Sequence, residues 1–317
     1  MNRRAWLARA LGGSGVLALA GCARPSERAL IVGAHPFPGY EMLYLARHLG
    51  LLPTDAVRLI ETPSASANLR ALASGLMEGA ALTLDEVLTA QAEGIDLVVV
   101  CVVDRSLGID VVLGGPRVRT LADLAGRRIG VERSATGAVM LDAALTAAKL
   151  TPGDVQLQSV PFDEQIAHFS AGKIDALVTY EPVRSRLLAG SAREIFSSRA
   201  IPGRILDTLA VHRGMLGAKP AEIRALVEAH FAARDAWLAA PSRHAPTLAL
   251  RLGLATPQVP AAFAGIELPD RRANRELFAA EASSLKAIAR ALSAVMVRAG
   301  LLGAAPDPQG LFDGRFV

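Results

Sequence analysis

Two stretches of this sequence, residues 51–87 and 150–183, follow the same order of residue types. Each begins with a proline and an aspartate in a short turn and continues through an apolar run. An amphipathic stretch follows and ends at a glycine, Gly75 in the first copy and Gly172 in the second. An acidic residue and a second apolar run close each copy. The pattern predicts a strand, a helix and a second strand. A unit that occurs twice predicts two lobes of similar build.

Apolar runs of strand length alternate with helical patterns through the first two thirds of the chain. The runs are residues 29–34, 57–60, 80–84, 97–103, 110–113, 128–131, 155–160, 176–179 and 209–211. This alternation is typical of largely parallel, doubly wound sheets. From Pro220 onward the pattern is helical, over residues 221–238, 247–253 and about 272–298. We therefore predict an α/β protein with two doubly wound lobes and a central cleft.

The length of 317 residues exceeds what one compact core normally holds, which agrees with two lobes. We expect residues 29–113 and 213–317 to form lobe 1 and residues 114–212 to form lobe 2. The chain is expected to cross between them at residues 114–119 and 207–212. The helices of the tail should then pack back on lobe 1.

Of the net charge of +4, three charges come from the start of the chain, where Arg3, Arg4 and Arg9 lie. Residues 22–317 carry 31 basic and 30 acidic side chains. They contain no basic run interleaved with aromatic residues, so nucleic acid is not an expected partner. The six histidines lack the spacing of metal ligands, so neither a metal nor another cofactor is expected.

The first 22 residues have the form of a lipoprotein signal peptide. A charged start at Arg3 and Arg4 precedes an apolar stretch over residues 11–20, and Leu19, Ala20, Gly21 and Cys22 form a lipobox. Cleavage after Gly21 would leave Cys22 to carry lipid and residues 22–28 to serve as a tether. The apolar stretch is too short to span a bilayer. We therefore expect an exported protein anchored in the cell envelope, on the periplasmic side in a Gram-negative cell.

Two alternatives remain open for this segment. A general secretory signal followed by an incidental Cys22 would leave the protein without lipid. Residues 2–7 also resemble the twin-arginine export motif, with Trp6 where phenylalanine is usual. The other cysteine, Cys101, lies in the apolar run 97–103, where we expect a buried and inert thiol. No disulfide is expected, because a lipid on Cys22 leaves Cys101 without a partner.

Polar and aromatic side chains follow five of the predicted strands. In open parallel sheets, ligands bind beyond these carboxyl ends. The candidate ligand-binding residues are Phe37, Tyr40, Thr83, Asp85, Asp104, Ser106, Ser134, Thr136, Gly137, Tyr180 and Glu181. Thr83, Asp85 and Thr136 could serve only as helix N-caps, and Asp104 and Ser106 could form a turn. Pro182 suits the first turn of a helix and would place Glu181 at its start, where capping and ligand binding are compatible.

Several of these residues stand in the order found in a known family. The sequence resembles the solute-binding proteins for nitrate, sulfonates, taurine and thiamine precursors. The resemblance lies in residues 37–40, 83–86, 104–110, 123–131, 180–182 and 265–268 with Asn274, and covers nearly the whole mature chain. It implies a type II periplasmic-binding-protein fold, with two crossings, that closes like a clamp on a small solute. It also implies docking on an ABC permease with its ATPase.

By position, the ligand contacts of the family fall on a subset of the candidates. They are Phe37, Tyr40, Thr83, Ser134, Thr136, Tyr180 and Glu181. The loop over residues 132–137 departs from the glycine-rich form common in the family, since Arg133 and Ser134 stand there. This departure leaves the identity of the substrate open.

We therefore expect a monomeric, non-enzymatic lipoprotein that delivers a small organic solute to an ABC importer. The carboxylates disfavour a plain inorganic anion and favour an amine or a heteroaromatic solute, such as a pyrimidine or an aminosulfonate. A lipoprotein sensor is one alternative, because it would bind its solute with the same clamp and signal to a membrane partner. An enzyme of pyrimidine or menaquinone metabolism on the same fold is another. The export signal and the lack of a clustered catalytic set in the sequence argue against that enzyme.

Overall fold

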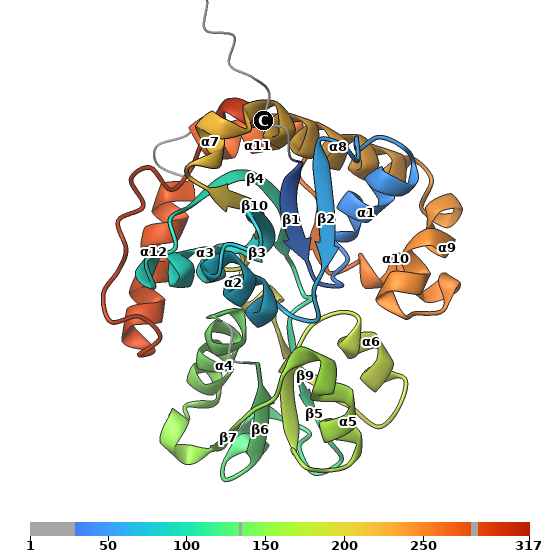
Figure 1. Cartoon of the computed structure of the whole chain (residues 1–317). Coiled ribbons are helices and arrows are strands. Elements are labelled where there is room, and N and C mark those ends of the chain that lie inside the picture. The colour runs from blue at the N-terminus through green and yellow to red at the C-terminus, as the bar shows by residue number, and fades with distance from the viewer. Residues whose placement is uncertain (1–28, 133–134, 280–284) are drawn as a thin grey trace, which may run out of the picture.

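The structure, a computed structural model, describes residues 29–132, 135–279 and 285–317. These residues form two lobes, each built on one β-sheet (Figure 1). The predicted signal peptide, Cys22 and the tether lie outside the described residues, as do Arg133 and Ser134. Within the described ranges, none of the helices has the length and apolar character that a membrane span requires.

The sheet of lobe 1 has six strands in the order β11-β4-β10-β3-β1-β2. Its strands are β1 (Leu30–Ala34), β2 (Val57–Glu61), β3 (Gly79–Thr83), β4 (Leu97–Ser106), β10 (Leu206–His212) and β11 (Ile266–Glu267). β1 pairs in parallel with β2 and β3, whereas β10 runs antiparallel between β3 and β4. Strands β3, β4 and β10 are buried along nearly their whole length, as their continuous apolar runs predict.

The sheet of lobe 2 has five strands in the order β7-β6-β8-β5-β9. Its strands are β5 (Val111–Gly114), β6 (Arg128–Val131), β7 (Gln156–Ser159), β8 (Ala176–Thr179) and β9 (Arg193–Ser197). β6 pairs in parallel with β7 and β8, and β5 runs antiparallel between β8 and β9, so this order matches β2-β1-β3-β10-β4 of lobe 1. The repeated segments form β2, α2 (Ala65–Ala73) and β3 in one lobe and β7, α5 (Gln165–Ser170) and β8 in the other. The predicted fold class is confirmed.

The boundaries between the lobes differ from those expected. Residues 111–113, expected in lobe 1, belong to β5 in the sheet of lobe 2. Residues 206–212, expected in lobe 2, form β10 near the centre of the sheet of lobe 1. An apolar run predicts that a strand is buried but not which sheet buries it. The crossings are therefore residues 107–110 and 198–205.

Most helices belong to lobe 1. They are α1 (Glu41–His48), α2, α3 (Leu84–Ala92), α7 (Met215–Ala218), α8 (Pro220–Ala239), α9 (Pro241–Leu252), α10 (Val259–Ala262), α11 (Arg271–Ala279) and α12 (Leu285–Arg298). Lobe 2 carries α4 (Ala135–Ala148), α5 and α6 (Val183–Leu188). The tail returns to lobe 1 as expected, since Ile223 and Leu226 of α8 share a core with Leu30 and Met42. The stretch predicted over 272–298 is described as two helices, one on each side of residues 280–284.

The two crossings lie side by side and are joined by hydrogen bonds. The amide of Gly108 donates to Ser198 Oγ at 2.7 Å, and the amide of Ser106 donates to the Ile205 carbonyl at 3.1 Å. Gly108 has a φ of +118°, and a Cβ at this position would lie 2.7 Å from Arg199 Nε. Glycine is thus required both by the backbone conformation and by the close approach of the second crossing.

Candidate functional site

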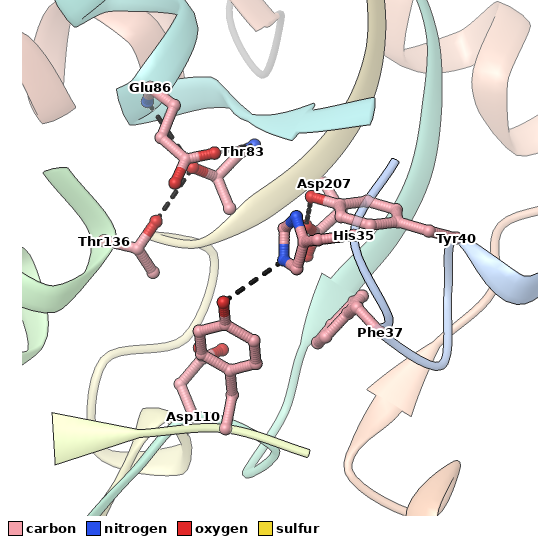
Figure 2. A pocket seen from close by; sticks show the side chains of 9 residues that line it. His35, Phe37, Tyr40, Thr83, Glu86, Asp110, Thr136 and Asp207 are labelled. Carbon is pink, nitrogen blue, oxygen red and sulfur yellow. Dashed lines mark hydrogen bonds between the residues drawn. The ribbon is translucent and has the colours of Figure 1, made fainter. Parts of the chain in front are cut away.

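The carboxyl ends of β1 and β3 in lobe 1 meet those of β6 and β8 in lobe 2 around two small cavities. The first has a volume of about 10 Å³ and is lined by His35, Phe37, Tyr40, Thr83, Glu86, Asp110, Thr136, Tyr180 and Asp207 (Figure 2). The second, also of about 10 Å³, is lined by Asp110, Glu132, Thr136, Gly137, Met140, Gln165, Val178, Thr179 and Tyr180. Such volumes admit about one water. The lobes are therefore closed, and a larger molecule can enter only if they separate.

Aromatic rings from both lobes form one wall of the first cavity. The ring centroids of Phe37 and Tyr180 lie 5.7 Å apart with the rings at 77°, and those of His35 and Tyr40 lie 5.2 Å apart at 87°. Behind this wall, Phe162 stacks on Tyr180 at 4.4 Å and 8°. The turn after β1 fixes Tyr40, because the amide of Tyr40 donates to the Phe37 carbonyl at 3.0 Å. A flat apolar solute could contact both the edges and the faces of these rings.

His35 is the polar member of this wall. Its Nε2 lies 3.2 Å from the hydroxyl of Tyr180 in the other lobe. Its Nδ1 has no hydrogen-bond partner among the described residues. Burial lowers the pKa of His35 to about 3, so the imidazole is neutral at physiological pH. A neutral ring can donate from one nitrogen and accept at the other.

Asp104 and Asp207 lie opposite each other on β4 and β10. The hydroxyl of Tyr40 donates a hydrogen bond to Asp207 Oδ1. Among the described residues, no amide, hydroxyl or cationic group donates to either oxygen of Asp104. Burial raises the pKa of Asp104 to about 8, and burial together with the charge of Asp104 raises the pKa of Asp207 well above its usual range. The pair therefore holds at least one proton at neutral pH.

This acid pair depends on a glycine in the turn after β1. A Cβ at Gly39 would lie 1.8 Å from Asp104 Oδ2. Any other residue at position 39 would displace either the turn or the carboxyl, and the turn carries the aromatic wall. Gly39 thus couples the position of the acid pair to that of the rings.

A chain of hydrogen bonds crosses between the lobes at Thr83. The Thr83 and Thr136 hydroxyls lie 2.8 Å apart, and Thr136 donates to Asp85 Oδ2 at 2.9 Å. Because Thr136 uses its proton on Asp85, the hydroxyl of Thr83 is the donor to Thr136. Thr83 also caps α3 in a capping box with Glu86. Burial raises the pKa of Asp85 to about 6 and that of Glu86 well above its usual range.

Asp110 lies in the first crossing and lines both cavities. Its Oδ2 accepts a hydrogen bond from the hydroxyl of Ser106 at 2.5 Å, and that hydroxyl lies 2.6 Å from the hydroxyl of Ser198. Burial raises the pKa of Asp110 to about 7. Ser106 does not line a cavity and acts by holding Asp110, so the hinge between the lobes and the site share one network.

The second cavity contains two partly satisfied polar side chains. The hydroxyl of Ser66 donates to Glu132 Oε1 at 3.1 Å, and Thr179 donates to Gln165 Oε1 at 2.6 Å. Glu132 Oε2 and Gln165 Nε2 have no partner within the described ranges. Burial raises the pKa of Glu132. One acceptor and one donor are therefore available to a ligand.

The structure brings most of the predicted site residues together. Phe37, Tyr40, Thr83, Thr136 and Tyr180 line the first cavity, and Gly137 lines the second. Asp85 and Asp104 lie one contact behind the lining, against Thr136 and Asp207. Ser106 supports Asp110. Ser134 lies outside the described residues.

Glu181 is turned away from both cavities. Its carboxylate accepts hydrogen bonds from Arg184 Nη1 at 3.0 Å, from the Ser185 amide at 3.1 Å and from the Ser185 hydroxyl at 2.9 Å. These partners all belong to α6. The geometry favours the capping alternative for Glu181 over the predicted ligand contact.

Sequence reasoning did not select several residues of the site. They are His35, Glu86, Asp110, Glu132, Phe162, Gln165 and Asp207. Glu86 directly follows Asp85, His35 lies two positions before Phe37 and Asp110 lies four positions after Ser106. Asp207 lies two positions before the predicted run 209–211, and the structure buries it in β10, where a carboxyl needs a polar partner. Over the described ranges, no group of three or more His, Cys, Asp and Glu side chains could hold a metal ion.

A family model described as the NMT1-like family matches residues 25–251 of the chain. No curated protein sequence matches it. Among solved structures, the alkanesulfonate-binding protein SsuA from Xanthomonas axonopodis pv. citri bound to MOPS is similar, with a TM-score of 0.77 and 21% identity. The match covers 92% of this chain and 99% of that protein.

Two further structures share the fold at lower similarity. The periplasmic aliphatic sulphonate binding protein SsuA from Escherichia coli matches with a TM-score of 0.70 and 20% identity, over 90% of this chain and 92% of its own. A mutant of DszB in complex with biphenyl-2-sulfinic acid matches with a TM-score of 0.61 and 18% identity, over 91% and 97%. DszB is a desulfurization enzyme, so the fold serves both binding proteins and an enzyme.

Proposed function

This chain belongs to the NMT1-like family and has the fold of periplasmic binding proteins, and we propose that it is a solute-binding lipoprotein of an ABC importer. It captures a small organic solute, of the sulfonate, amine or pyrimidine-like kind, between its lobes. The observation that carries the proposal is the convergence of side chains from four strand ends, two in each lobe, on one closed cavity. The sequence resemblance to solute-binding proteins agrees with it.

Contacts between the lobes support a clamp mechanism. Thr83 meets Thr136, His35 meets Tyr180 and Ser66 meets Glu132, so each hydrogen bond joins lobe 1 to lobe 2. A solute enters when the lobes part, and closing replaces water around it with these side chains. The importer recovers the solute by separating the lobes again. Both steps need rotation at the paired crossings, residues 107–110 and 198–205.

The anchor belongs to the same proposal. Lipid on Cys22 would hold the protein at a membrane through residues 22–28. The described chain starts at Ala29, whose carbonyl accepts a hydrogen bond from Lys219 Nζ at 3.0 Å. Lys219 also pairs with Glu78 at 2.8 Å. Ala29, which follows the tether in the sequence, is thus held on lobe 1.

Reconstitution with the transporter tests this function. The full lipidated chain is added to proteoliposomes that contain a candidate ABC permease and ATPase from the same organism, and ATP hydrolysis is measured. We expect the chain to stimulate hydrolysis, and a Cys22→Ser variant to need a higher concentration because it is not held at the membrane. Thr83→Arg, which places a long side chain between the lobes, should fail to stimulate. A protein that binds and closes without affecting any importer would instead support the sensor alternative.

A further inference from the structure

Six carboxyl groups surround the two cavities without a cationic partner. They are Asp85, Glu86, Asp104, Asp110, Glu132 and Asp207, and each side chain is at most 5% exposed. Among the described residues, no ion pair includes any of them. No lysine or arginine occurs in the described lining of either cavity. Burying this many carboxylates together is unfavourable unless protons or cations neutralise them.

The other buried carboxylates among the described residues each form an ion pair with an arginine. Glu41 and Glu181 are both fully buried. Glu41 forms an ion pair with Arg251 at 2.7 Å, and Glu181 forms one with Arg184 at 3.0 Å. The cavity carboxyls stand out against this pattern. Burial raises the pKa of each of the six, and a cation bound beside them would favour their ionised form.

Unpartnered polar atoms at the cavity give a second, independent sign of a ligand. Glu132 Oε2, Gln165 Nε2 and His35 Nδ1 lack hydrogen bonds within the described part of the chain. These three side chains are 5%, 1% and 3% exposed and line the cavities. A buried group without a partner costs free energy that a ligand can recover. Two of the three atoms can accept a hydrogen bond, which suits a ligand rich in N–H donors.

The aromatic wall defines the other part of the ligand. Phe37 and Tyr180 meet edge to face at the cavity, and Tyr40 adds a third ring, 4.9 Å from Phe37. Such rings hold a flat group and attract a positive charge to their faces. Asp207, Glu86 and Asp110 line the same cavity, so one small molecule can contact rings and carboxyls together.

We propose that the solute is an organic cation, an amine or amidinium carried on a flat ring, and that an anion such as a sulfonate is rejected. The inference rests on the proposed solute-binding function and narrows its substrate class. The cationic N–H groups donate to Asp207, Glu86 and Asp110 while the ring packs on Phe37 and Tyr180. A sulfonate at the same place would find no lysine or arginine in the described lining to offset its charge. The inference separates this chain from the binding proteins whose names refer to sulfonates.

Calorimetric titration of the full mature chain with three matched probes tests the inference. Benzamidine carries the amidinium, benzamide is its neutral counterpart and benzenesulfonate is an anion of similar size. We expect benzamidine to bind at least about tenfold more tightly than benzamide, and benzenesulfonate not to bind. Asp207→Asn and, independently, Glu86→Gln should each weaken benzamidine binding about tenfold. Glu276→Gln, which removes an exposed carboxylate from α11, should leave the affinity unchanged.

The outcomes separate the inference from the function on which it rests. Tighter binding of benzenesulfonate or benzamide than of benzamidine would overturn the inference and leave solute capture standing. No binding of benzamidine by a chain that still stimulates the importer would also overturn only the inference. Failure of all three probes together with failure of stimulation would remove both. If Asp207→Asn does not fold, the affinity of Glu86→Gln for benzamidine shows whether the cavity carboxyls bind the cation.

Discussion

Two groups of buried carboxyls in this protein differ in what lies beside them. Glu41 begins α1 and Glu181 lies just before α6, and each has an arginine, at 2.7 and 3.0 Å. Asp207 lines the cavity between the lobes, and Asp104 lies behind it as its partner across β4 and β10. All four are at most 2% exposed, so burial alone does not distinguish them. The difference is the presence of a cation supplied by the chain itself.

This difference indicates what each group does. A carboxylate with its own arginine joins two elements, as Glu41 of α1 does through one oxygen with Arg251 of α9, although burial still raises the pKa of Glu41 to about 7. A buried carboxyl without an arginine has a raised pKa and can still accept hydrogen bonds from the N–H groups of a ligand. The first kind contributes to the folded state, and the second kind keeps the cavity selective for positive charge at some cost in stability.

Removing the cation from a satisfied carboxylate is the strongest way to break the comparison. In Arg251→Met, Glu41 remains buried without a partner, and the stacking of Arg251 on Tyr44 at 3.2 Å is lost. We expect the free energy of unfolding to fall by about 3–5 kcal/mol, measured by urea denaturation. Glu41→Gln in the same chain should restore part of the loss. Arg272→Met, which breaks an exposed pair with Glu276, serves as the control and should have no measurable effect. A fall below about 1 kcal/mol in Arg251→Met would show that Glu41 needs no cation either.

The pH dependence of stability tests the unpaired carboxyls. Unfolded aspartates titrate near about 3.9. The folded pKa values are about 7 for Asp110 and about 8 for Asp104, while that of Asp207 lies well above its usual range. The folded state therefore binds more protons over this interval, and stability falls as the pH rises. His35 and His230, with pKa values of about 3, oppose this trend only below about pH 6.5.

Between pH 6.5 and 8 we therefore expect the unliganded protein to lose at least about 2 kcal/mol, since each proton contributes about 1.4 kcal/mol per pH unit. Urea denaturation at a series of pH values measures this loss. Asp104→Asn should flatten the curve, because it removes one of the titrating groups, and Glu276→Gln should not change it. Stability that rises over this interval would mean that the cavity carboxyls are ionised and compensated in the folded protein.

How much of this could be predicted from the sequence depends on how local the signal is. The two-lobed α/β fold and the strand ends at Phe37, Thr83 and Tyr180 followed from patterns within about forty residues. The lobe of β5 and β10 did not, because their antiparallel neighbours are distant in sequence. The predicted ligand contact of Glu181 could not be judged from the sequence for a related reason. A residue at the junction of a strand and a helix can face the cavity or its own helix, and only the packed structure of α6 decides between them.

The smallest expected effect concerns a contact that closes the lobes without touching the cavity. Arg186 of α6 donates to the carbonyls of Leu252 at 2.7 Å and Gly253 at 3.1 Å, at the carboxyl end of α9 in the other lobe. Losing one such hydrogen bond shifts the equilibrium toward the open form by about 1 kcal/mol. Arg186→Lys keeps the charge but loses the forked geometry, so we expect benzamidine binding to weaken about fivefold.

The pH dependence of this effect separates closure from selectivity. Arg186→Lys should weaken binding by the same factor at pH 6.5 and at pH 8, because Arg186 touches no cavity carboxyl. Wild-type affinity for benzamidine should itself rise over this interval, since the cation must displace fewer protons as the pH increases. Asp207→Asn should reduce that rise, whereas Arg186→Lys should preserve it. Calorimetry at the two pH values measures both slopes, and equal slopes in the wild type and Asp207→Asn would mean that the acid pair takes no part in meeting the cation.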